Sequence, residues 1–68
     1  MRAVDMCGKE ICVGDCVLVH QDEGSKVAIV HELFPETPTI NEPGFWIDID
    51  HLDGSGIEGM MSYIVEVL

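Results

Sequence analysis

One acidic segment holds the residues that come nearest to a metal site. Asp48, Asp50 and Asp53 precede a glycine turn at intervals that resemble the oxygen ligands of calcium-binding loops. The register of such a loop fails, because placing Asp53 and Gly54 at its fifth and sixth positions puts Met60 at the twelfth, where a glutamate is needed. The three aspartates remain candidates for a loose cation site, but a solvated acidic strand end is the preferred interpretation.

Three cysteines and a histidine supply a second set of metal-binding residue types. Cys7, Cys12, Cys16 and His20 follow the spacing C-x4-C-x3-C-x3-H. Structural zinc sites usually present close pairs of ligands, the second pair lying farther along the chain. Cys16 and His20 would instead lie on one extended strand, where they converge poorly. We therefore expect no metal and three reduced thiols, an odd number that fits a cytoplasmic location.

A nucleophilic active site would need a serine or cysteine beside a histidine that a carboxylate orients. Histidines stand at positions 20, 31 and 51, and no sequence motif brings one of them beside a nucleophile. Ser55 lies between two glycines, but without the strand–turn–helix context of a hydrolase nucleophile. Asp48 and Asp50 share a strand face and could act as an acid–base pair, although paired acids on an exposed strand are usually solvated. The sequence thus predicts a protein that is not an enzyme and has no cofactor.

A tryptophan beside two carboxylates is the sharper chemical feature. Residues 44–50 alternate between apolar side chains, which belong in a core, and a stripe of one tryptophan and two aspartates. Aromatic anchors dominate the energetics of interfaces, and the surrounding charge selects the partner. The candidate partner-binding residues are Trp46, Asp48, Asp50, Phe34 and Glu36, the last two at the start of a proline-containing loop. Two alternatives stay open for Trp46, namely a cap on the end of the barrel or a contact between two copies of the chain.

Short β-branched runs between turn signals must position these residues, and they predict an all-β domain with little or no helix. Prolines exclude regular strand pairing in the loop between residues 35 and 43. Both faces of residues 26–34 are fairly apolar, so this strand should be central and buried on both sides or against a partner. We expect strands at residues 16–21, 26–34, 44–50 and 60–68, a turn at residues 22–25, and a glycine-rich turn at residues 54–59.

The segment from Gly8 to Val19 resembles the opening of many SH3-like small barrels. Their pattern is an apolar residue, a spacer, Gly-Asp and an alternating apolar strand, here met by Ile11, by Gly14 with Asp15, and by the strand from Cys16. The resemblance covers about half of the chain and implies a barrel of about five short antiparallel strands that serves as an adaptor. The chain lacks the paired aromatic run of signalling SH3 domains, so a proline-rich ligand is not indicated. Small proteins of phages and mobile gene cassettes are often similar, which suggests such an origin.

Size and charge restrict the function further. The 68 residues make one small domain with a thin core. Thirteen acidic and three basic residues give a net charge of −10, which argues against direct binding to nucleic acid or to an anionic membrane. The hydrophobic share of 47% exceeds what so small a core can hold, so we expect self-association. The N-terminus also lacks the apolar core of a signal peptide.

Three functions follow, in order of preference. The first is a non-catalytic protein-binding module whose acidic face engages a basic protein and which forms homo-oligomers. The second is an inhibitor that mimics nucleic acid by presenting carboxylates at a phosphate-like spacing. The third is a small metal-binding protein.

Overall fold

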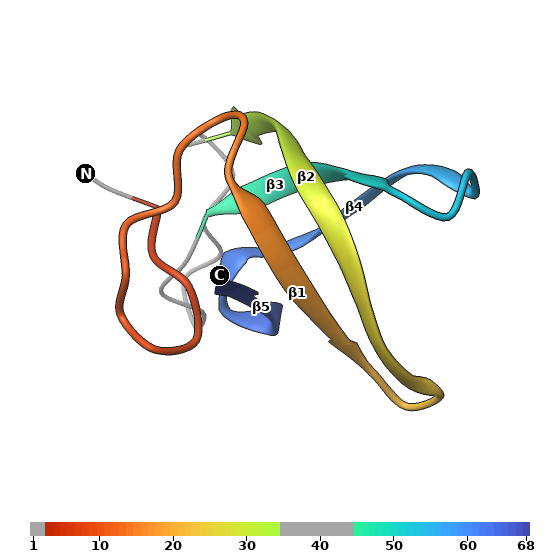
Figure 1. Ribbon diagram of the computed structural model, residues 1–68. Helices are drawn as coiled ribbons and strands as arrows, with labels where there is room; N and C mark the ends of the chain where they lie inside the picture. The colour runs from red at the N-terminus through yellow and green to blue at the C-terminus, as the bar shows by residue number, and fades with distance from the viewer. Residues whose placement is uncertain (1–2, 35–44) are drawn as a thin grey trace.

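The structure is a computed structural model that describes residues 3–34 and 45–68. Five antiparallel strands form one sheet with the order β4-β3-β2-β1-β5 (Figure 1). The prediction of an all-β domain with about five short antiparallel strands and little helix is confirmed. The elements are β1 (Cys16–Gln21), β2 (Gly24–Phe34), β3 (Trp46–His51), β4 (Gly56–Met61), the 3-10 turn η1 (Ser62–Ile64) and β5 (Val65–Val67).

The sheet curls so that its last strand returns to its first. Strands β1 to β4 pair in sequence order, and η1 then carries the chain back to place Val65 opposite Val19 and Val67 opposite Val17. In Figure 1 the β3–β4 hairpin runs across the β1–β2 hairpin. Within the described residues, no helix is long and apolar enough to cross a bilayer.

Alternation along the strands fills the inside of the curl. Alternate residues in the middle of β1, β2 and β3 are apolar and buried, as the period of two in their sequences predicts. The core residues that the strands contribute are Val17, Val19, Ala28, Val30, Ile47, Ile49, Met60 and Val65. Burying such side chains is the main source of stability in a domain this small.

Strand β2 is central, as predicted, but only one of its faces is buried within the chain. Val27 and His31 on the outer side are exposed. The register with β3 shifts between Val30 and Glu32, which indicates an extra residue in β2. This bulge returns Leu33 to the core side, where it packs against the buried cluster. Cover of the outer side by another copy stays a prediction.

The predicted turn at residues 54–59 and the single closing strand at residues 60–68 are wrong. The turn lies at residues 52–55, and β4 already begins at Gly56. The closing segment breaks at the buried Ser62, whose N–H donates to the Phe45 carbonyl (2.8 Å) and whose Oγ accepts from the Phe45 N–H (3.3 Å). These bonds hold the chain against the start of β3, and the 3-10 turn follows there.

A buried carboxylate helps to fix the segment before β1 to the sheet, together with the bond from the Met6 N–H to the Val65 carbonyl (3.0 Å). Asp5 is 3% exposed, and its Oδ1 accepts the N–H groups of Cys7 and Lys9 at 2.8 Å each. Its Oδ2 accepts the N–H of Val67 in β5 at 2.7 Å. Burial raises the pKa of Asp5, but the donors of Val67, Lys9 and Cys7, with the charge of Lys9, outweigh it and hold the pKa below 3.8.

Candidate functional site

The outer face of β3 carries the three central candidate residues. Ile47 and Ile49 are fully buried, so Trp46, Asp48 and Asp50 lie on the side of the strand that faces away from the core. The predicted alternation is therefore confirmed. The Trp46 residue is 40% exposed, which leaves much of a large aromatic side chain open to a partner.

Strand β2 extends this outer face. Phe34 pairs directly with Trp46, and Glu32 pairs directly with Asp48. Phe34, one of the predicted partner contacts, is half-buried, and its pairing places it beside the tryptophan. Glu36, the remaining predicted contact, lies outside the described residues. Sequence reasoning missed Glu32, because the bulge in β2 changes which of its residues face outward.

A glycine in β4 sets the position of the tryptophan. A Cβ atom built on Gly59 would lie 2.7 Å from Cζ2 and Nε1 of the Trp46 indole. The indole therefore lies directly on the backbone of β4, where only a glycine leaves room for it. Covering a strand glycine with an aromatic ring compensates for its missing side chain. Trp46 is thus held in one place while part of its ring stays exposed.

The carboxylates around Trp46 lack counter-charges among the residues that the structure describes. Glu32 and Asp48 stand directly opposite each other, and two like charges in this arrangement destabilise a sheet. Within residues 3–34 and 45–68, the side chains of Glu32, Asp48 and Asp50 have no hydrogen bond and no ion pair. A cation from outside the chain would relieve this repulsion.

The other end of the same face is apolar. The Leu52 N–H donates to the Val27 carbonyl (3.3 Å), which places these two residues side by side, and Ile57 pairs with Asp50 on the same outer side of the sheet. All three are exposed. We call Val27, Leu52 and Ile57 the apolar patch. It is of the kind that self-association covers.

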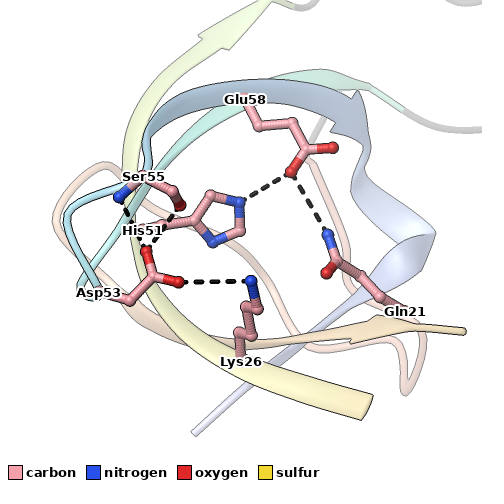
Figure 2. A network of polar contacts seen from close by, with 6 residues as sticks. All are labelled: Gln21, Lys26, His51, Asp53, Ser55 and Glu58. Carbon is pink, nitrogen blue, oxygen red and sulfur yellow. Dashed lines mark hydrogen bonds and ion pairs between the residues drawn. The ribbon is translucent and has the colours of Figure 1, made fainter. Parts of the chain in front are cut away.

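A polar network lies beside the core where β3 meets β4 (Figure 2). His51 is 7% exposed and its Nε2 lies 2.7 Å from Glu58 Oε1, which also accepts from Gln21 Nε2 at 3.3 Å. An ionised carboxylate only accepts, so in neutral His51 the Nε2 atom carries the proton and donates it. The Nδ1 atom has no partner within the described part of the chain. In Figure 2 the ring lies between Glu58 and the pair formed by Lys26 and Asp53.

Asp53 is separated from the other two aspartates of the candidate cation site. Its Oδ1 accepts from the N–H and Oγ of Ser55 (2.9 and 2.6 Å), and its Oδ2 lies 3.3 Å from Lys26 Nζ. The bonds from Ser55 lower the pKa of Asp53 to about 2, with a smaller contribution from Lys26. The carboxylate thus shapes the β3–β4 turn. The described residues contain no group of three or more His, Cys, Asp or Glu that could hold a metal ion, and this covers the cysteine–histidine set as well.

The structure does bring a serine, a histidine and a carboxylate together. His20 Nδ1 lies 3.2 Å from Ser25 Oγ, and His20 Nε2 lies 3.2 Å from Glu66 Oε1. His20 and Ser25 are direct partners across the β1–β2 hairpin, and Glu66 lies on the neighbouring β5. The imidazole and the carboxylate are each 38% exposed, so water competes for both bonds. This geometry is that of a surface ladder across three strands.

No protein-family model, curated protein or solved structure matches this chain.

Proposed function

We propose that the protein is a non-catalytic binding module whose outer face, formed by Phe34, Trp46, Glu32, Asp48 and Asp50, binds a basic surface of another protein. The observation that carries this proposal is the placement of Trp46 on Gly59, beside carboxylates that have no counter-charge in the described part of the chain. The indole is held in place and partly exposed, so little conformational entropy is lost when a partner covers it.

Charge complementarity selects the partner. Glu32 and Asp48 repel each other in the free protein, and a lysine or arginine placed between them would remove that cost. The net charge of −10 would also speed the encounter with a positively charged surface, and this effect weakens as salt is added.

The proposal includes self-association and a cytoplasmic location. The apolar patch supports the first, since its three exposed side chains adjoin the acidic residues on one face. The three free, exposed cysteines support the second, because reducing compartments keep thiols in this state. The curled sheet of five antiparallel strands supports the resemblance to SH3-like barrels.

Replacement of the tryptophan tests the proposal. Proteins captured from a cell extract by the wild-type chain are identified, and the affinity of each purified partner is measured for Trp46→Ala and for Tyr63→Ala. Tyr63 is the matched control, because it is an aromatic residue of nearly equal exposure, 42% against 40%, and lies in η1. We expect Trp46→Ala to weaken binding by about 30-fold or more, as loss of an interface anchor does, and Tyr63→Ala to leave it nearly unchanged.

Equal affinities of the two variants would refute the role of the outer face.

An inhibitor that mimics nucleic acid would use the same carboxylates, and a different measurement identifies it. In that case the captured protein releases bound DNA or RNA when the wild-type chain is added, and Asp48→Asn with Asp50→Asn abolishes the release.

A further inference from the structure

A hollow of about 470 Å³ opens where the curled sheet brings β4 close to the end of β1. These strands are not neighbours in the sheet, and the bond from Gln21 Nε2 to Glu58 Oε1 spans the seam between them. The hollow lies on the inner side of β4, whereas Gly59 with its tryptophan cover faces outward. Its lining residues are His20, Gln21, Asp22, Glu23, Glu58, Met60 and Ile64.

The lining combines apolar and acidic groups. Met60 is part of the core cluster and Ile64 packs against that cluster, so they give the hollow an apolar floor. Glu58 is engaged by His51 and Gln21. Asp22 and Glu23, in the turn between β1 and β2, are exposed and have no ion pair within the described residues. Two carboxylates without an ion pair in the described chain therefore stand beside a hollow whose floor is apolar.

We propose that this hollow is a second binding site, which takes one lysine or arginine side chain from a basic protein segment. Such a side chain has an aliphatic stem that suits the floor of Met60 and Ile64, and a charged end that reaches Asp22 and Glu23 at the rim. The inference does not depend on the role of the outer face, because the two sites lie on opposite sides of β4.

Other occupants fit the lining less well. An anion would meet three carboxylates, and no group of ligands for a metal ion exists among the described residues. A purely apolar side chain would leave Asp22 and Glu23 without a counter-charge. A lysine or arginine side chain suits both parts of the lining, because its aliphatic stem covers the apolar floor and its charged end meets the carboxylates.

Short peptides test this site without any natural partner. Acetyl-Gly-Lys-Gly-amide and acetyl-Gly-Arg-Gly-amide are titrated into the isotope-labelled protein at about 0.15 M salt, where the screening length is about 8 Å. We expect shifts of the NMR resonances of Gln21, Glu23, Met60 and Ile64. Asp22→Asn with Glu23→Gln should weaken the binding by about fivefold, since an exposed ion pair contributes up to about 1 kcal/mol.

Two controls separate this site from general attraction to an acidic protein. Asp48→Asn with Asp50→Asn removes the same charge from the outer face, which is itself proposed to attract basic side chains. In this variant the affinity taken from the shifts of the hollow resonances alone should stay within about twofold, because those carboxylates lie on the outer side of the sheet and the hollow lies on its inner side. A peptide with norleucine in place of lysine keeps the stem and lacks the cation, and it should not bind. The proposal is overturned if the hollow resonances do not shift, if norleucine binds equally well, or if both charge variants weaken binding alike.

Discussion

Replacing Asp5 by alanine should lower the free energy of unfolding by about 3–5 kcal/mol. The substitution removes three hydrogen bonds to one buried carboxylate, and bonds to charged groups contribute about 1.5–3 kcal/mol each. The sum of the three contributions is an upper bound. If the N-terminal loop detaches, the N–H groups of Cys7 and Lys9 can bond to water instead, whereas the N–H of Val67 stays in β5. A chain of this length has only about 3–10 kcal/mol of stability, so the variant should be largely unfolded or lack its docked N-terminal segment.

Denaturant unfolding of Asp5→Ala and Asp15→Ala checks this expectation. Asp15 is the matched control, since its Oδ2 accepts a single exposed bond from the Cys12 N–H at 2.8 Å. Because water competes for this exposed bond, its loss should cost only about 1 kcal/mol. Similar destabilisation by the two variants would show that the buried bonds of Asp5 do not hold the N-terminal segment to β5.

The Asp5 carboxylate should also make the free energy of unfolding depend on pH. The pKa of Asp5 is lower in the folded chain than its ordinary value of 3.8, so its contribution is fully present well above pH 3.8. The contribution is lost as the pH falls through the folded-state pKa. The stability advantage of the wild type over Asp5→Asn should therefore shrink between about pH 5 and about pH 2. An advantage that stays constant over this range would contradict the assignment.

The second large effect is expected at Ile49. This residue is fully buried among strands β2, β3 and β4, and truncating such a side chain to alanine costs about 2–5 kcal/mol. Ile57 in β4 is the matched control, because the same residue type is 54% exposed in the apolar patch. Ile57→Ala should cost about 1 kcal/mol or less.

The loss of stability on thermal unfolding of Ile49→Ala and of Ile57→Ala shows which face of the sheet is buried in the core. Equal losses would mean that the outer face is as buried as the inner one, which the proposed binding role of Trp46 cannot accommodate. Sedimentation of Ile57→Ala adds a second readout, because a loss of dimer without a loss of folding would identify the apolar patch as the contact between copies.

Local periodicity made part of this fold predictable. The limits of β1 at Cys16–Gln21 agree with prediction, because a run of apolar residues there starts after Gly14-Asp15 and ends at a turn. The sidedness of β3 also follows from the sequence, since Ile47 and Ile49 alternate with acids. Both features depend only on neighbouring residues.

The strand limits in the C-terminal third depend on contacts between residues distant in sequence, which local patterns do not predict. Gly59 favoured a turn, yet it lies within β4 because the Trp46 ring covers it. The break at Ser62 comes from its two bonds to Phe45, a residue 17 positions earlier in the chain. Strand propensity alone could not distinguish one closing strand from two strands and a turn.

The candidate site residues also divide into those that local alternation predicts and those that depend on distant contacts. Trp46, Asp48 and Asp50 were found from their alternation, whereas Glu32 joined them only through the bulge in β2. Partners distant in sequence were missed altogether. Asp5 and Val67 are 62 positions apart, and His20 and Glu66 are 46 apart. The hollow likewise needs the curl of the sheet, because Gln21 and Glu58 meet only across its seam.

The most direct test of the binding face uses its own tryptophan as the probe. The chain contains one tryptophan, so protein labelled with 5-fluorotryptophan gives a single fluorine resonance from Trp46. Addition of a captured partner should shift that resonance and shield it from a soluble paramagnetic quencher, because the ring becomes covered. A saturated complex in which the resonance keeps both its position and its accessibility would show that the partner binds elsewhere.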